Sequence, residues 1–288
     1  MIRQSSQALL VALLAPALLG LLVFRLYPIA IAIISSFYTT VFGDAAFTGF
    51  GNYASLFSDR VFWKSLQVTL WFNLLVNPIQ IAISLGLALL YVRGFPGAGV
   101  YQVFFLMPIG VSVPTAVIVW RVMLSQGGLA NGLLDLVGVA PQAWLTSSRL
   151  ALYSIIAIAT WKGASYWMVF IVGGLQNISP ELYDAARVDG VRPWQRLIFI
   201  TLPLLRPALL FVLAADVSIN FLLFAPIYML TQGGPAGSTD VLMYEAYKQG
   251  FIFGDMGRAM AVVVVIVAVL LIVVALQFKL LSAREQGA

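Results

Sequence analysis

Six long apolar stretches constrain this chain more than any other feature of its sequence. A helix needs roughly 20 mainly apolar residues to cross the hydrocarbon core of a bilayer, and six segments reach that length. Because unpaired backbone groups are costly in lipid, such segments fold as helices. We therefore predict an all-α, polytopic membrane protein whose six spans cover about residues 9–37, 62–91, 101–124, 151–175, 207–230 and 259–281.

The composition agrees with lipid as the main solvent. Of the 288 residues, 61% are hydrophobic and only 9% are charged, whereas a soluble domain carries about 25% charged residues. The net charge of +5 comes from scattered lysines and arginines, which is typical of membrane topology rather than nucleic-acid binding. The first apolar run continues past Ala15-Pro16-Ala17, so we expect a retained helix and one transmembrane domain over residues 1–288.

The distribution of arginines predicts the orientation of the spans. An even number of spans places both termini on one side of the membrane. The segment between the fourth and fifth spans, residues 176–206, contains a cluster of arginines, and the positive-inside rule assigns it to the cytoplasm together with both termini. The cluster consists of Arg187, Arg192, Arg196 and Arg206, and the other basic residues expected on that side are Arg3, Arg93, Lys279 and Arg284.

Several kinds of chemistry are excluded by residues that the chain lacks. It has no Cys and no His, which removes thiolate nucleophiles, imidazole bases and the commonest zinc ligands. An aspartyl intramembrane protease needs two aspartates inside spans, and only Asp216 qualifies. A phosphate-binding loop of the form Gly-x4-Gly-Lys-Ser/Thr is missing, because no Lys follows Gly237 in the glycine-rich stretch. We expect a protein that is not an enzyme, binds no metal and has no ATPase site of its own.

Residues 176–206 predict local structure where most loops need none. Ser179 is a good N-cap, and Pro180 suits the first position of a helix. Gly190 is the residue type that ends a helix in the left-handed conformation. Pro193 begins a second helix, which we expect to stop at Leu202-Pro203. The spacing alone leaves two alternatives open: this pair of helices docks on a partner, or it lies flat on the membrane.

The loop contains the sequence Ile178-Ser179-Pro180-Glu181-Leu182-Tyr183-Asp184-Ala185-Ala186-Arg187-Val188-Asp189-Gly190, followed by Ile200-Thr201-Leu202-Pro203. These residues resemble the "EAA" loop of binding-protein-dependent ABC importer permeases. The resemblance implies a coupling helix that seats in a cleft of an ATP-binding subunit, with Asp184 in the place of the family's glutamate. The implied coupling residues are Glu181, Asp184, Ala185, Ala186, Gly190, Leu202 and Pro203.

A second stretch, from Leu230-Thr231-Gln232-Gly233-Gly234-Pro235 to Gly257, is similar to the carbohydrate branch of that family, near the maltose and glycerol-phosphate permeases. The resemblance implies a type I ABC importer permease in the bacterial inner membrane. It would translocate a sugar or sugar-like solute by alternating access. The implied partners are two ATP-binding subunits carrying ATP and magnesium, a second homologous permease and an extracytoplasmic solute-binding protein. The alternatives are transport of a sugar phosphate or other anionic sugar derivative, and a self-contained secondary transporter.

The second predicted span carries a polar face. Polar residues recur at steps of three and four, the period of one helix face: Ser65, Thr69, Asn73, Asn77, Gln80 and Ser84. Because amides are costly in lipid, we expect this face to point at protein or water. Two roles remain open, which are lining a solute pathway and hydrogen bonding between helices.

Three ionisable residues lie well inside predicted spans, namely Arg25, Lys162 and Asp216. Such residues are usually paired or functional. A salt bridge between Lys162 and Asp216 and direct contact with solute are both open. Neighbouring aromatic and amide side chains complete the candidate pathway, which comprises Asn73, Asn77, Gln80, Arg25, Lys162, Tyr166, Trp167, Asp216 and Asn220.

Overall fold

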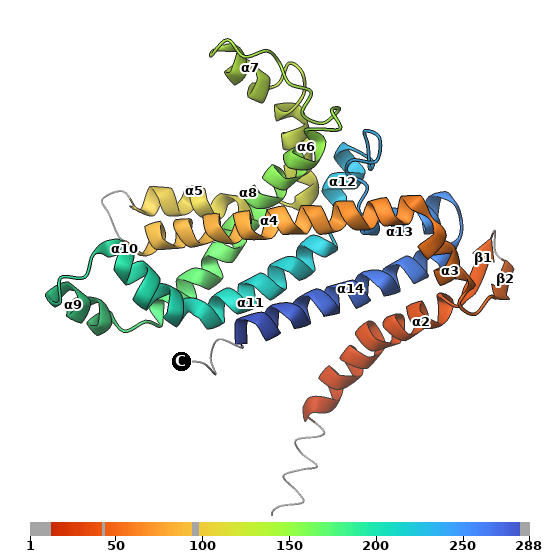
Figure 1. Cartoon of the computed structure of the whole chain (residues 1–288), viewed down its shortest axis with the longest axis horizontal. Coiled ribbons are helices and arrows are strands. Elements are labelled where there is room, and N and C mark those ends of the chain that lie inside the picture. Colours follow the sequence, from red (N-terminus) through yellow and green to blue (C-terminus); the bar gives the residue numbers. More distant parts are fainter. Residues whose placement is uncertain (1–12, 42–43, 94–97, 283–288) are drawn as a thin grey trace, which may run out of the picture. The chain divides into compact units, whose positions relative to one another are not determined.

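The computed structural model describes residues 13–41, 44–93 and 98–282, and most of them lie in helices (Figure 1). The predicted all-α membrane fold is confirmed. The helices are η1 (Leu22–Leu26), α2 (Tyr27–Ser35), α3 (Gly51–Ser58), α4 (Arg60–Val92), α5 (Ala98–Gly110), α6 (Val113–Met123), α7 (Leu129–Asp135), α8 (Ala151–Gln176), α9 (Pro180–Val188), α10 (Pro193–Arg196), η2 (Leu197–Thr201), α11 (Leu202–Phe221), α12 (Ala225–Leu230), α13 (Leu242–Tyr247), η3 (Lys248–Ile252) and α14 (Met256–Ser282).

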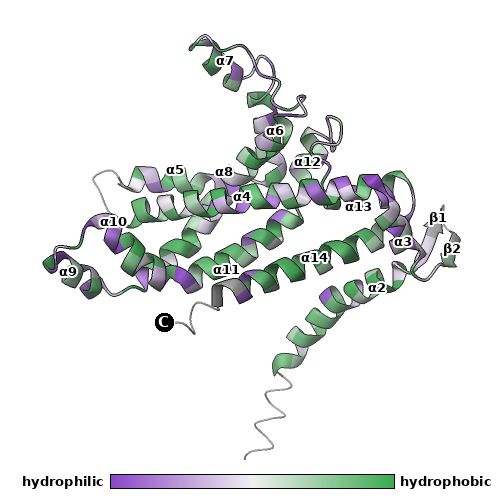
Figure 2. Ribbon diagram, viewed as in Figure 1, coloured by the Kyte–Doolittle hydropathy of each residue, from purple (hydrophilic) through white to green (hydrophobic). Residues whose placement is uncertain are grey.

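Within the described residues, five helical stretches are long and apolar enough to cross a membrane, and a bent pair of helices gives a sixth candidate. The apolar character of these stretches is visible along α11 and α14 (Figure 2). The five stretches are Leu13–Ser35, Arg60–Val92, Ala151–Gln176, Pro193–Leu230 and Met256–Lys279, and the bent pair is Gly99–Gly110 with Val113–Met123. Residues 9–12 of the first predicted span, with Arg3 and Arg284, lie outside the described residues.

The third predicted span is not one uninterrupted helix, so that part of the prediction is wrong. Its two halves, α5 and α6, meet at an angle of 106°. Ser112 has an extended backbone and its hydroxyl accepts a hydrogen bond from the backbone of Thr115, which begins a new helix with Pro114 in the first turn. An N-cap and a proline at this point favour a fresh start over continuation.

The predicted stop at Leu202-Pro203 is also wrong. Helix α10 passes through the π-helical turn η2 directly into α11, and the amide of Leu202 donates to the carbonyl of Leu197. Pro203 lies in the first turn of α11, where a missing N–H is tolerated. A π turn changes the hydrogen-bonding step just before the proline. The second loop helix therefore continues into the fifth predicted span as far as Phe221, where α11 ends.

The chain forms two compact units, which comprise the described parts of Met1–Trp63 with Glu245–Ala268 and of Lys64–Tyr244 with Val269–Ala288. The first unit contains a small antiparallel hairpin that the sequence analysis missed, formed by β1 (Tyr38–Val41) and β2 (Asp44–Phe47). Buried Asn52 donates to the carbonyls of Ser36 and Tyr38, at 2.9 Å each, and so fixes the start of this hairpin. The prediction of one transmembrane domain stays a prediction.

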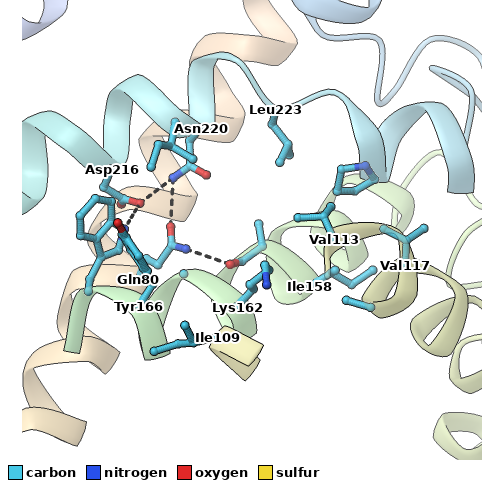
Figure 3. Close-up of a pocket in the computed structure, with 16 residues that line it drawn as sticks. Gln80, Ile109, Val113, Val117, Ile158, Lys162, Tyr166, Asp216, Asn220 and Leu223 are labelled. Atoms are coloured by element: carbon cyan, nitrogen blue, oxygen red, sulfur yellow. Dashed lines mark hydrogen bonds between the residues drawn. The ribbon is translucent and has the colours of Figure 1, made fainter. Parts of the chain in front are cut away.

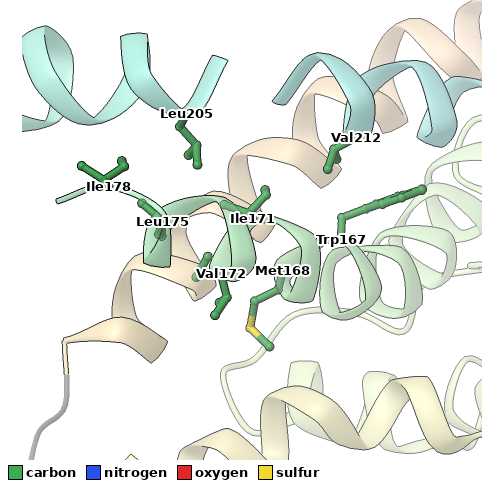
Figure 4. Close-up of a cluster of buried hydrophobic side chains, with 9 residues drawn as sticks. Trp167, Met168, Ile171, Val172, Leu175, Ile178, Leu205 and Val212 are labelled. Atoms are coloured by element: carbon green, nitrogen blue, oxygen red, sulfur yellow. The ribbon is translucent and has the colours of Figure 1, made fainter. Parts of the chain in front are cut away.

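The core of the second unit is built on α8. Helix α8 packs against both α5 and α11, and Figure 4 shows the buried cluster in which side chains of α8 meet Leu205 and Val212 of α11. The helices approach closely at Gly174. A Cβ atom there would lie 2.7 Å from Leu205 Cδ1 and 2.8 Å from the Cβ of Ala208. Small residues at such crossings allow close packing in membranes.

The close approach at Gly174 gives a matched test of this packing. Gly174→Val would force α8 and α11 apart, and overpacking of this kind costs about 1–3 kcal/mol. We expect a lower unfolding temperature in detergent. The control is Gly173→Val on the same helix, where a Cβ meets no atom within 4 Å. Equal unfolding temperatures for the two variants would contradict this account of the core.

Candidate functional site

The polar face of α4 is buried. All six residues predicted for that face have little or no exposure: Ser65, Thr69, Asn73, Asn77, Gln80 and Ser84. At its N-terminal end, the hydroxyl of Thr69 accepts a hydrogen bond from the backbone of Leu242 at 2.8 Å. All six residues of this polar face are therefore covered by other parts of the chain, as expected for side chains that avoid lipid.

One amide joins α4 to α11. The side-chain nitrogen of Asn220 donates to Asn77 Oδ1 at 2.7 Å, to Gln80 Oε1 at 3.0 Å and to Asp216 Oδ1 at 3.0 Å. An amide has two protons, so three acceptors share them. Hydrogen bonding between helices, one of the two roles left open for the polar face, is thus what Asn77 and Gln80 do in this structure.

Asp216 is the ionisable residue of this network. It is 1% exposed, and its Oδ1 also accepts a 2.6 Å hydrogen bond from the indole nitrogen of Trp167. Its second oxygen, Oδ2, is buried and has no hydrogen-bond partner among the described residues. A buried carboxyl oxygen without a donor is costly, so Oδ2 still has the capacity to accept a hydrogen bond.

Gly163 makes room for Gln80. The Gln80 amide donates to the carbonyl of Ala159 at 2.8 Å, and it lies where a Cβ atom on Gly163 would be. Both interactions of Gln80, with α8 and with Asn220, therefore depend on the missing side chain at position 163. A glycine is needed here because the Gln80 side chain approaches the backbone of α8 closely, and the sequence pattern did not predict this contact.

Lys162 caps the break between α5 and α6. Its ammonium donates to the carbonyls of Pro108, at 3.1 Å, and Val111. Within the described residues it forms no ion pair with Asp216, so the salt-bridge alternative is not what the structure has. A cation at the C-terminal end of a helix is favourable because the last carbonyls lack partners there.

This cap gives a further prediction. Hydrogen bonds from charged groups contribute about 1.5–3 kcal/mol, so Lys162→Met is expected to destabilise the protein by about 2 kcal/mol. The measurement is thermal unfolding in detergent. Lys279→Met, which removes an exposed lysine from the last turn of α14, is the control. An unaltered unfolding temperature for Lys162→Met would count against the capping role.

A cavity of about 370 Å³ brings most of the predicted pathway residues together (Figure 3). Its polar lining comes from α4, α8 and α11, and its apolar wall comes largely from α5, α6 and α8. Six of the nine predicted pathway residues line it: Gln80, Lys162, Tyr166, Trp167, Asp216 and Asn220. The apolar wall, which the sequence analysis missed, includes Ile109, Val113, Ala116, Val117, Ile158, Ile219 and Leu223.

The other three candidates lie elsewhere. Asn73 and Asn77 line a separate cavity of about 750 Å³ together with Gln277 of α14. Asn77 nevertheless reaches the network through Asn220. Arg25 lies in η1 with an exposed side chain, in the first compact unit. The structure therefore separates the candidates into one cavity group, one neighbouring pair and one exposed arginine.

The loop between α8 and α11 has the local structure expected from its caps. The hydroxyl of Ser179 accepts from the backbone of Glu181 at 3.3 Å, and Pro180 begins α9. At the other end Gly190 has φ +70°, and Val191 N donates to Ala186 O at 2.9 Å. With the bond from Gly190 to Arg187, this is the Schellman motif. The predicted helix, glycine break and second helix are all present.

Most of the surface of α9 is not covered by the rest of the described chain. Glu181, Asp184 and Ala185 are exposed, Ala186 is buried against the chain, and Val188 is 88% exposed. Asp184 and Arg187 form an exposed ion pair of 3.3 Å, which contributes little to stability. Of the last predicted coupling residues, Leu202 is half-buried and Pro203 is exposed at the start of α11.

Comparison with known protein families decides the identity. The family described as "binding-protein-dependent transport system inner membrane component" matches residues 80–286. This chain belongs to that family. The match includes α9, the break at Gly190 and every cavity residue from Gln80 to Asn220, whereas Arg25, Asn73 and Asn77 precede it. Members of the family are transport subunits in the inner membrane rather than enzymes.

Relatives and a solved structure extend the match over almost the whole permease. It is 36% identical to the lactose transport system permease protein of Rhizobium radiobacter, over 83% of this chain and 82% of that protein. It is 31% identical to the sn-glycerol-3-phosphate transport system permease protein of Agrobacterium fabrum, over 94% of each. A bacterial alginate ABC transporter, solved with an alginate pentasaccharide-bound periplasmic protein, has the same fold, with 22% identity and a TM-score of 0.80 over 96% of this chain and 94% of that one.

Proposed function

We propose that this chain is the permease subunit of an ABC importer and that it translocates a neutral sugar or similar polyhydroxylated solute. The observation that carries the proposal is the continuity of α10, η2 and α11. Helix α11 holds Asp216 and Asn220 in the cavity wall. A force applied to the capped loop is thereby transmitted along one helix to the residues that would contact solute. Alternating access needs a rigid connection of this kind.

The partners follow from the same arrangement. The chain has no phosphate-binding loop of its own, so two ATP-binding subunits would supply hydrolysis and hold ATP and magnesium. A second homologous permease would complete the translocation path, and an extracytoplasmic binding protein would deliver the solute. The periplasmic protein bound to the alginate transporter supports this last partner. The loop arginines favour a cytoplasmic side for α9 and for both termini.

The charge of the cavity favours a neutral solute over an anionic one. Its acid, Asp216, has one oxygen without a partner, and its base, Lys162, is engaged by two carbonyls. A phosphate or carboxylate would meet the carboxyl group of Asp216, and carbonyls already take two of the three N–H donors of Lys162. Amides and a carboxylate oxygen suit hydroxyl groups, which donate and accept. The lactose permease relative supports a neutral sugar, while the relative that transports sn-glycerol-3-phosphate marks the alternative.

Reconstitution tests the proposal. The purified transporter, with the subunits that copurify, is placed in liposomes, and uptake of radiolabelled neutral sugars and of glycerol phosphate is measured with and without ATP inside. We expect uptake of a neutral sugar that requires both ATP and a binding protein. Uptake that continues without ATP would favour a self-contained secondary transporter. ATP-dependent uptake of glycerol phosphate alone would leave the importer in place and overturn the choice of a neutral solute.

A further inference from the structure

A second, basic pocket lies where the end of α4 meets the loop helices. Its volume is about 600 Å³, and residues of α4, α8, α9, α10 and η2 line it. Three arginines contribute to the lining, namely Arg93, Arg187 and Arg196, and no carboxylate does. The pocket shares no residue with the cavity that holds Asp216. It therefore calls for an explanation other than solute transport.

The positive charges of this pocket are poorly matched within the chain. Arg196 Nε is buried without a hydrogen-bond partner among the described residues. Among the described residues, Arg187 forms one ion pair, the exposed pair with Asp184, and no carboxylate forms an ion pair with Arg93. A buried donor that lacks an acceptor is costly. Three guanidinium groups around one cavity are a strong match for phosphate oxygens.

The surroundings of the arginines fit a lipid better than a small ion. The pocket lies at the ends of two candidate spans, because α4 ends at Val92 and α8 ends at Gln176. Its lining also contains apolar side chains, among them Leu89 and Leu175, and the aromatic side chain of Trp194. Tryptophan and arginine together are typical of the headgroup level of a membrane. A phosphate bound here would be followed by acyl chains that run along the apolar ends of the helices.

We propose that this pocket binds the headgroup phosphate of an anionic phospholipid, with Arg93 and Arg196 as its main ligands. Basic pockets between spans on the cytoplasmic side are suited to such headgroups. A lipid bound there would contact α4, α9 and α10 together, and so would hold the coupling loop against the spans. The proposal concerns lipid binding only and does not depend on which solute the permease carries.

The test measures lipid-dependent stabilisation of the detergent-purified transporter with its copurifying subunits. Thermal unfolding is followed while phosphatidylglycerol, phosphatidylcholine or inorganic phosphate is added. We expect phosphatidylglycerol alone to raise the unfolding temperature. The double variant Arg93→Gln/Arg196→Gln is expected to lower the apparent affinity for phosphatidylglycerol roughly thirtyfold, since each charge at the surface contributes about one factor of five to six. Arg93→Gln alone, at an exposed position, guards against misfolding of the double variant.

The control is Arg192→Gln, which removes an exposed arginine of the same loop that does not line the pocket. It is expected to keep the full response to phosphatidylglycerol. Three results would overturn the proposal. The first is an undiminished lipid response in the double variant, and the second is an equal response to inorganic phosphate. The third is a double variant that loses a copurifying subunit but still binds phosphatidylglycerol. That result would show that the pocket contacts a protein rather than a lipid.

Discussion

Gly190→Val is expected to reduce solute-stimulated ATP hydrolysis by the assembled transporter at least tenfold while the permease still reaches the membrane. Gly190 has φ +70°, a conformation that costs an L-residue about 1–2 kcal/mol and a β-branched residue more. The strain would break the bonds from Val191 to Ala186 and from Gly190 to Arg187. Every 1.4 kcal/mol lost from the docked geometry is a factor of ten, so we expect at least a tenfold fall in stimulated hydrolysis.

A matched glycine separates coupling from general strain. Gly138 also has a positive φ, of 73°, and a Cβ atom would meet nothing within 4 Å at either position. Gly138→Val therefore introduces a similar strain in the loop that follows α7. Hydrolysis should be unaffected there. Normal stimulated hydrolysis in Gly190→Val, or an equal loss in both variants, would contradict the role of the α9 loop in coupling.

Asp216→Asn is expected to reduce uptake of a neutral sugar at least tenfold with little change in stability. The amide oxygen can still accept from Trp167 and Asn220, as Oδ1 does now. Only the partnerless oxygen is replaced, by a donor. A hydrogen bond to a charged group contributes about 1.5–3 kcal/mol, which corresponds to a factor of about ten to one hundred. Uptake at sub-saturating sugar and the unfolding temperature are measured on the same preparation.

Asp135→Asn controls for the loss of one negative charge, because Asp135 is exposed at the end of α7. That variant should transport at the normal rate. If Asp216→Asn transports equally well, the oxygen without a partner does not contact solute, and the network is purely a connection between helices. If its unfolding temperature falls sharply instead, a structural role for the carboxylate outweighs a role in binding.

Local chemistry made parts of this permease predictable. The caps of α9 depend on residues within a few positions of one another, so Ser179, Pro180 and Gly190 specify them without help from the rest of the chain. The buried face of α4 could be predicted equally well. Its polar residues recur with the period of a helix, and exposing them to lipid would be costly. The family resemblance then gave the fold and the transport role.

The contacts between distant elements could not be predicted in this way. Lys162 was expected to pair with Asp216 or solute, but its acceptors are carbonyls 51 and 54 residues away, freed by a helix break that hydropathy does not reveal. Ser112 and Pro114 carried the signal for that break. At Pro203 the sequence predicted the end of a helix, but a π turn allows the helix to continue. The need for glycine at position 163 could be recognised only in the structure, where the Gln80 side chain fills the space that a Cβ atom on Gly163 would take.

Site-specific crosslinking from α9 tests the central claim most directly. The chain contains no Cys, so Ala185→Cys places a single thiol on the exposed surface of α9, and Leu136→Cys, at an 81% exposed position after α7, serves as the control. With a short bifunctional reagent in membranes, we predict a product that joins Ala185→Cys to a nucleotide-hydrolysing subunit and no such product from Leu136→Cys. If Ala185→Cys crosslinks only to lipid or to nothing, α9 is not the element through which a separate ATPase drives this permease.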